Sequence, residues 1–365
     1  MSKEKEKNCL RPKGRPSVGA DDRQSNQSHN ASITYPGQNC NSKILDTKSM
    51  AEIYDTVYLG KPPLIDGLLY PGTYLFAGAP KLGKSFLMAQ IAYHISMGLD
   101  MWGFTVRQGT VLYLALEDDY SRLQERLYRM FGTDSTDNLH FAISASDLAN
   151  GLDEQLENFI KARPDTSLII IDTLQKIREV GGEKYSYAND YEIIARLKEF
   201  ADKAGICLLL VHHTRKQSAD DKFDMISGTT GLLGAADGAF LLQKKKRTSN
   251  DATLEVSGRD QPDQKLKLHR DPETLKWGLE EVEVDLWREP PEPVLERISE
   301  YFDSEHDRWS GCATDLCEQF GIKLRPNVLT MKLNINAGRL FREYGIKYTT
   351  IRMHDGRMVY LWKEG

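Results

Sequence analysis

The sequence is poor in cysteine and has no long apolar run. Its five cysteines are too few and too scattered for a disulfide framework. No apolar run approaches the roughly 20 residues that a membrane-spanning helix needs, and the charged N-terminus has no apolar signal core. These absences exclude a disulfide scaffold and a membrane protein, and they predict a soluble, cytoplasmic chain.

Charge is distributed unevenly, although the formal net charge is only −5. Residues 1–45 hold eight Lys/Arg against four Asp/Glu, and residues 321–365 hold nine against three. Residues 271–320 hold four against fifteen. Basic segments on both sides of an acidic body suit a nucleic-acid partner, although charge alone favours the alternative, a solubilising surface. Within the first segment, Arg11-Pro12-Lys13-Gly14-Arg15-Pro16 resembles an AT-hook core for A·T-rich duplex DNA, with an ordinary disordered tail as the alternative.

The pattern along the chain predicts an α/β domain between a tail and a linker. Residues 1–45 lack apolar periodicity and are expected to form a disordered basic tail. Across residues 46–281, near-continuous apolar strands alternate with helical stretches, which predicts a parallel sheet covered by helices on both faces. The expected strands are 73–77, 110–116, 139–143, 168–171, 206–211 and 239–242, with an antiparallel extension at 253–257 and 265–269. The expected helices are 84–97, 120–131, 152–162 and 191–204.

A smaller module is expected after an acidic linker at 282–293. Residues 294–365 predict three helices and then two strands, and the Asp355-Gly356 pair between those strands is typical of a hairpin turn. This order is that of a winged helix-turn-helix, which binds duplex DNA or, alternatively, another protein. Its candidate DNA contacts are Lys332, Arg339, Arg342 and Arg357.

A phosphate-binding loop is the most specific motif of the chain. Gly78-Ala79-Pro80-Lys81-Leu82-Gly83-Lys84-Ser85 matches G-x-x-x-x-G-K-[ST], and it lies between an expected strand and an expected helix, as the motif requires. Backbone N–H groups and the helix N-terminus would bind the β-phosphate. Lys84 would contact the β- and γ-phosphates, and Ser85 would hold Mg²⁺. The sequence therefore predicts ATP and Mg²⁺ as cofactors.

Two acidic residues follow expected strands. Asp172 ends the run 168–171, and Mg²⁺ would offset the desolvation of a carboxylate at a buried strand tip, as in a Walker B motif. A helix N-cap is the alternative role for Asp172. Glu117 is the first polar residue after the strand 110–116 and is the expected group that activates the attacking water. Its neighbours Asp118 and Asp119 are expected to cap the next helix.

A histidine pair follows the fifth expected strand. His212 and His213 stand where a polar group would contact the γ-phosphate, and His213 is slightly preferred. A metal site formed by the pair is disfavoured because adjacent residues on a strand point to opposite faces.

Together and in this order, these elements resemble the RecA-like ATPases, above all the RepA-type replicative helicases of plasmids and their phage and mobile-element relatives. The resemblance covers roughly residues 64–281. It is carried by Gly78–Ser85, Ala115–Asp118, Ile170–Thr173, Val211–Lys216, Ser227–Asp237 and Ser257–Asp260.

The resemblance implies a homo-hexameric ring with ATP between subunits and single-stranded DNA in the channel. It assigns water activation to Glu117 and the γ-phosphate contact to one residue of the His212/His213 pair. Channel-facing candidates are Lys176, Arg178, Lys184, Arg215 and Lys216. Many relatives carry an Arg finger just before the small-residue block, whereas this chain reads Met225-Ile226-Ser227-Gly228 there. The candidates that would replace this finger in trans are Lys244, Lys246, Arg247 and Arg259.

The function expected from these features is that of an ATP-driven DNA helicase or translocase serving a mobile element. The alternative is a regulatory or recombination-accessory ATPase that binds DNA and uses ATP to switch its assembly. A small-molecule kinase is disfavoured because the sequence shows no Arg-rich lid, and a GTPase because no Asn-Lys-x-Asp motif occurs.

Overall fold

The structure is a computed structural model of the whole chain. It describes residues 45, 47–178, 187–214, 222–226, 230–244, 246, 248–259, 261–283, 290–302, 306–353 and 356–363. Residues 1–44 of the tail predicted at 1–45 lie outside the described residues, as do the candidate cations Lys184, Arg215, Lys216 and Arg247. Within the described residues, no helix is long and apolar enough to cross a membrane.

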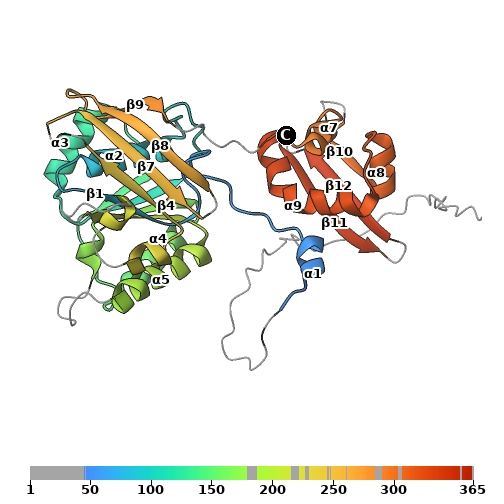
Figure 1. Cartoon of the computed structure of the whole chain (residues 1–365), viewed down its shortest axis with the longest axis horizontal. Coiled ribbons are helices and arrows are strands. Elements are labelled where there is room, and N and C mark those ends of the chain that lie inside the picture. The colour runs from blue at the N-terminus through green and yellow to red at the C-terminus, as the bar shows by residue number, and fades with distance from the viewer. Residues whose placement is uncertain are drawn as a thin grey trace, which may run out of the picture. The chain divides into compact units, whose positions relative to one another are not determined.

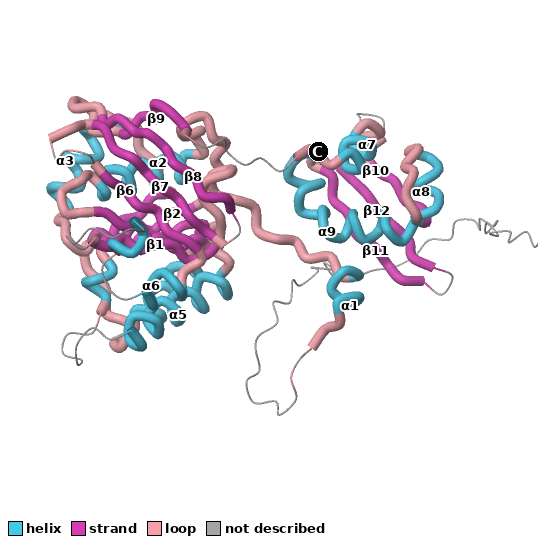
Figure 2. The backbone as a smooth tube through the Cα atoms, in the orientation of Figure 1, coloured by secondary structure: helices cyan, strands magenta, loops and turns pink. Residues whose placement is uncertain are grey.

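A nine-stranded sheet organises the larger domain (Figures 1 and 2). Its strand order is β3-β2-β4-β5-β1-β6-β7-β8-β9. The first six strands in this order run parallel: β3 (Leu139–Ala142), β2 (Thr110–Ala115), β4 (Thr166–Asp172), β5 (Cys207–His213), β1 (Gly72–Gly78) and β6 (Gly238–Gln243). The last three extend the sheet antiparallel: β7 (Asp251–Gly258), β8 (Gln261–Arg270) and β9 (Trp277–Val282).

Helices cover the parallel strands on both faces. The first face packs α2 (Lys84–Met97) and α3 (Tyr120–Phe131), and the second packs α4 (Leu152–Ala162), α5 (Tyr187–Ala204) and α6 (Thr230–Ala235). Strand β1 shows the alternation directly, because Tyr74 and Phe76 belong to the first core while Leu75 and Ala77 belong to the second. Burial on both faces explains the near-continuous apolar strands. The predicted RecA-like α/β core is confirmed.

Residues 290–363 form the smaller module, built on an antiparallel sheet of order β10-β12-β11. Its elements are α7 (Pro293–Ser299), β10 (Arg308–Cys312), α8 (Ala313–Gln319), α9 (Pro326–Tyr344), β11 (Ile346–Met353) and β12 (Gly356–Lys363). Apolar residues of all three helices and all three strands share one core. Strand β10 was not predicted from the sequence.

A short N-terminal helix belongs to this module by contact. Helix α1 (Met50–Asp55) starts at Ser49, which forms a capping box with Glu52. The side-chain amide of Asn334 on α9 donates to the carbonyl of Tyr54 at 2.9 Å. The sequence did not predict this helix, because α1 itself contributes no buried residue.

Candidate nucleotide-binding site

The strand order gathers the predicted site residues at one edge of the sheet. Strands β2, β4, β5 and β1 are neighbours and run parallel, so their carboxyl ends lie side by side. Glu117 follows β2, Asp172 ends β4, His213 ends β5, and the P-loop follows β1. Residues that are up to 135 positions apart in the sequence therefore meet at one edge.

The P-loop has the backbone that a phosphate cradle needs. Lys81 and Gly83 adopt left-handed conformations, with φ values of 64° and 101°. The φ value of Gly83 favours glycine, and a Cβ atom there would also be tightly placed, 3.0 Å from Nη1 of Arg270 and 3.1 Å from Cζ2 of Trp277. Gly83 is also the N-cap of α2 and has no side-chain oxygen to bind the first-turn N–H groups. Such a helix N-terminus binds anions.

Lys84 lies at the centre of this cradle. Its ammonium donates to the carbonyls of Gly78 at 2.8 Å and Ala79 at 3.1 Å, and it lies 3.1 Å from Nδ1 of His213. Burial lowers the pKa of Lys84 to about 8 despite the opposing carboxylates of Asp172 and Glu117. Phosphate oxygens would restore the full charge of this lysine.

Of the two histidines, His213 lies beside the P-loop lysine. Burial and the Lys84 charge lower the pKa of His213, which favours the neutral imidazole. The side chain of His212 is only 5% exposed and lies in the interior. The geometry thus favours His213 as the candidate γ-phosphate contact.

The residues proposed for Mg²⁺ form a connected oxygen cluster. The Ser85 hydroxyl donates to Oδ2 of Asp172 at 2.7 Å, and the Tyr113 hydroxyl donates to the same oxygen at 2.8 Å. Burial raises the pKa of Asp172, while these two hydrogen bonds act to lower it. A buried carboxylate beside a hydroxyl is a donor set that suits Mg²⁺, whose charge would offset the desolvation of Asp172.

Tyr113 is a further residue of this site, and the sequence pattern did not predict it. It lies on β2, where it pairs with Ile170 of β4, and its side chain is fully buried. A tyrosine within a buried strand indicates that its hydroxyl needs a hydrogen-bond partner. The identity of that partner follows from the pairing of β2 with β4, which the sequence does not show.

We expect Tyr113→Phe to raise the Mg²⁺ concentration needed for half-maximal ATP hydrolysis by roughly tenfold, because outer hydrogen bonds orient metal-binding carboxylates. A Mg²⁺ titration of the hydrolysis rate measures this. Tyr348→Phe is the matched control, since it removes another buried tyrosine hydrogen bond, to Asn334 in the smaller module. Equal Mg²⁺ dependence of parent and Tyr113→Phe would contradict the role.

Three successive acids after β2 have different surroundings. Asp118 forms an ion pair with Arg126 at 2.6 Å, and Asp119 caps α3 by accepting from the backbone N–H of Arg122 at 2.9 Å. Glu117 is exposed, and its Oε1 accepts from the hydroxyl of Thr173, the residue after Asp172, at 3.2 Å. Glu117 is therefore the acid of this run that is directed toward the Asp172 strand end.

A cavity of about 690 Å³ opens beside the P-loop. Ala79 and Leu82 line one side, and residues of β6 to β9 line the other. Pockets that bind small molecules have volumes in this range, and this one adjoins the P-loop.

Cations and aromatic rings alternate next to this cavity. Arg126 lies over Phe86 at 5.2 Å, and Arg270 lies between Phe86 at 5.7 Å and Trp277 at 5.8 Å. The Lys244 ammonium also lies over the ring of Trp277, 5.3 Å from its centroid. Arg270 and Trp277 could not be identified from the sequence, because β8 and β9 approach the P-loop only in the folded sheet.

The candidates for a finger in trans occupy different places. Lys244 donates to the carbonyl of Ser249, and its ring partner Trp277 donates to the carbonyl of Gly83 at 3.3 Å. Lys244 thus lies beside the P-loop of the same chain. Lys246 is exposed.

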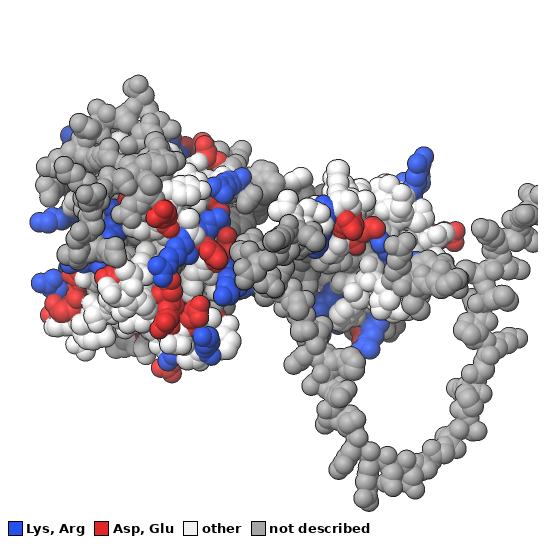
Figure 3. Space-filling model, turned by 90° about the horizontal axis from the view of Figure 1, so that it is seen from below, with Lys and Arg blue, Asp and Glu red and all other residues white. Residues whose placement is uncertain are grey.

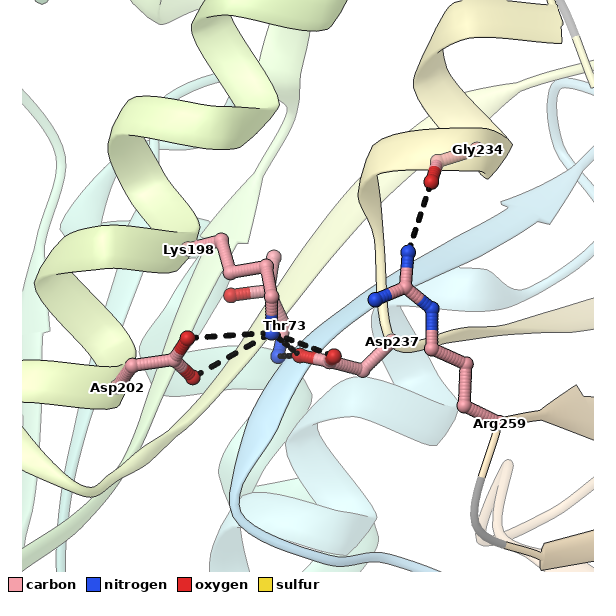
Figure 4. A network of polar contacts seen from close by, with 6 residues as sticks. All are labelled: Thr73, Lys198, Asp202, Gly234, Asp237 and Arg259. Carbon is pink, nitrogen blue, oxygen red and sulfur yellow. Dashed lines mark hydrogen bonds and ion pairs between the residues drawn. The ribbon is translucent and has the colours of Figure 1, made fainter. Parts of the chain in front are cut away.

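Arg259 lies at the other edge of the sheet. It follows β7, whose Gly258 pairs with Gly238 at the start of β6, so it is remote from the P-loop of the same subunit. Its exposed guanidinium donates to the carbonyl of Gly234 at 2.9 Å (Figure 4). Nearby, Lys198 pairs with Asp237, which accepts from the backbone N–H of Thr73 at 2.9 Å.

Two candidate DNA contacts are buried in ion pairs. Arg178 is 7% exposed and lies 3.0 Å from Asp190, which is 1% exposed. Arg339 is 8% exposed, pairs with Glu343, and donates to the carbonyl of Pro290 at 2.6 Å. Both arginines remain predicted DNA contacts, but a DNA phosphate would have to compete with these internal partners, and for Arg178 it would leave the buried carboxylate of Asp190 without its cation.

The other described candidates are accessible to different degrees. Lys332 pairs with Glu292 at 2.9 Å, and Arg357 pairs with Asp55 of α1 at 3.1 Å. Lys176 and Arg342 are exposed. On the face of the larger domain seen in Figure 3, positive and negative side chains are interspersed.

The strand order, the P-loop and the residues at the strand ends define the fold of the larger domain as a RecA-like P-loop core. A protein-family model described as an AAA domain matches residues 60–219. The chain is similar to a solved structure whose title describes an ATPase domain, with a TM-score of 0.49 and 15% identity over 58% of this chain and 85% of that chain. It is also similar to a structure titled as a DnaB-like replicative helicase and its interactions with primase, with a TM-score of 0.46 and 15% identity over 57% of each chain. No curated protein matches the sequence.

Proposed function

We propose that this chain is an ATP-hydrolysing motor that acts on DNA, a RepA-type helicase or translocase that forms a hexameric ring and serves the replication of a mobile element. The observation that carries the proposal is the meeting of Lys84, Ser85, Asp172, Glu117 and His213 at one sheet edge. These are the groups that phosphate binding, metal binding, water activation and γ-phosphate sensing require.

Each residue has one task in this mechanism. The P-loop N–H groups and Lys84 bind the β- and γ-phosphates, while Ser85 and Asp172 hold Mg²⁺, which neutralises charge on the phosphates when bound. Glu117, positioned by Thr173, orients the attacking water and accepts its proton. His213 contacts the γ-phosphate next to Lys84. Because His213 is the last residue of β5, this contact connects the presence of the γ-phosphate to the end of that strand.

The DNA part of the proposal rests on the resemblance and on the placement of one cation. Exposed Lys176 lies in the short 3-10 helix η1 (Leu174–Ile177), directly after the Asp172 strand end. A change at the metal site during hydrolysis would therefore reach a DNA-contacting loop across only a few residues.

We expect single-stranded DNA to stimulate ATP hydrolysis several-fold, and Lys176→Ala to reduce that stimulation. Lys161→Ala is the matched control, because Lys161 is an exposed lysine on α4 that pairs with Glu157. Steady-state phosphate release with and without oligonucleotide measures both effects. A rate that DNA leaves unchanged would refute the motor. A stimulated ATPase that displaces no strand would favour the regulatory ATPase.

A further inference from the structure

The sheet of the smaller module has one covered face and one open face. Trp309, Tyr348 and Leu361 point into the helical core and are at most 7% exposed. The residues that alternate with them point to the other face, where Ile351 is 48% exposed. A groove of about 460 Å³ crosses this open face. Its outward-facing residues include Arg308, Ser310, Thr349, Tyr360 and Trp362.

Two aromatic rings stand on the central strand of this face. Tyr360 and Trp362 lie two positions apart on β12, so they project from the same side about 7 Å from each other. Trp362 pairs with Arg308 on β10 and with Lys347 on β11. Tyr360 has Ser310 and Thr349 as its two cross-strand neighbours. Each ring is thus flanked by groups that hydrogen-bond sugars and phosphates.

The charge of the sheet points to a polyanionic ligand. Of the Lys and Arg residues in the three strands, Arg308 and Lys347 alternate onto the open face beside Trp362. The three strands contain no Asp or Glu, although the whole chain has more acidic than basic residues. Arg308 is 82% exposed, and its contact with Asp307 is a long, exposed pair of 3.8 Å, which contributes little. The Lys347 ammonium lies over the ring of Phe341 at 5.4 Å.

We propose that this open face binds single-stranded nucleic acid. Bases stack on Tyr360 and Trp362, while the backbone phosphates contact Arg308 and Lys347. Aromatic side chains on an open sheet, flanked by cations, bind unpaired bases with little sequence preference because every base has a π-face. An apolar protein segment would contact the rings but would gain nothing from Arg308 and Lys347 beside them.

This site is separate from the proposed motor and from the helix first considered for DNA. It lies outside the ATPase domain and needs no ATP. On α9, Lys332 and Arg339 already pair with carboxylates of the module itself. The open sheet face would hold a strand independently of the nucleotide state.

The test measures anisotropy of a fluorescein-labelled oligodeoxythymidylate with the full-length protein at low salt and without nucleotide. Trp362→Leu and Tyr360→Leu keep apolar bulk but remove the ring, and each is expected to weaken binding about tenfold. The corresponding Phe variants keep a ring and are expected to retain binding. Ile335→Ala is the control, because it removes an apolar side chain that is 58% exposed on α9 and lies outside the open sheet face.

Unchanged affinity in the Trp362→Leu/Tyr360→Leu double variant would overturn the proposal. Oligonucleotide binding that is lost on Ala but retained on Leu substitution would show that apolar bulk and not an aromatic ring is needed, which would also overturn base stacking. Photocrosslinking of the parental protein to a bromouracil oligonucleotide gives a measurement without any variant. Trypsin cleavage after Arg357 and Lys363 releases 358–363, and an adduct on this peptide supports the site. Adducts confined to residues 64–283 would overturn the proposal. This outcome does not depend on whether DNA stimulates ATP hydrolysis.

Discussion

Glu117→Gln is expected to bind ATP as tightly as the parent while hydrolysis falls by about 10²–10⁴-fold, the usual contribution of a general base. The amide keeps the size of Glu117 and its contact with Thr173, but it cannot take a proton. Lys84→Ala is expected to behave differently. It removes a buried cation from the phosphate cradle, so both nucleotide affinity and turnover fall. Titration with a fluorescent ATP analogue and a phosphate-release assay separate the two outcomes.

The neighbouring acid supplies the matched control for this experiment. Asp118 is held by Arg126 at 2.6 Å, so Asp118→Asn should leave hydrolysis close to the parental rate. The assignment fails if Asp118→Asn stops hydrolysis while Glu117→Gln does not. Asp118 would then hold the attacking water.

The parallel core was predictable because its signal is local. Strands buried on both faces are near-continuous apolar runs, and helices between them carry their own periodicity. The P-loop, Asp172 and Glu117 were predictable for a related reason, since each directly follows such a run. Strand β9, in contrast, is WGLEEV, with two adjacent glutamates and a mostly accessible surface. Its apolar signal is too weak to reveal a strand.

Contacts across strands could not be read from the sequence. The bond from Tyr113 to Asp172 depends on the pairing of β2 with β4. The approach of Arg270 to Gly83 depends on an antiparallel extension that returns to the P-loop. Strand periodicity placed His212 and His213 on opposite faces without showing which face meets Lys84.

Surface cations were the least predictable residues. Helical spacing placed Lys332, Arg339 and Arg342 within reach of one face, but spacing does not show which positive charges already have partners. The structure buries Arg339 and pairs Lys332 with Glu292, leaving Arg342 exposed. Buried and paired cations are poor DNA contacts, because binding must first break an internal interaction.

In the ring that we propose, one subunit is expected to supply a cation to the ATP site of its neighbour. Such a finger contributes about 10³–10⁵ to the rate of phosphoryl transfer. Arg259 suits this role better than Lys244 does. Arg259 is exposed and remote from its own P-loop, whereas Lys244 adjoins that loop through Trp277. We therefore expect the Arg259→Ala variant to lose ATP hydrolysis while its affinity for ATP stays at the parental value.

Mixing subunits tests whether Arg259 acts across an interface. Arg259→Ala and Lys84→Ala proteins should each be inactive alone, yet a mixed ring contains junctions where an intact P-loop meets an intact Arg259. Random one-to-one mixing in a head-to-tail ring predicts about a quarter of the parental activity. Lys244→Ala mixed with Lys84→Ala should regain nothing, because both changes damage the site within a single subunit. If Arg259→Ala hydrolyses ATP at the parental rate, Arg259 is not the finger. The same mixing experiment then applies to Lys246 and Arg247. Both follow the end of β6, close in sequence to Lys244, which lines the cavity beside the P-loop.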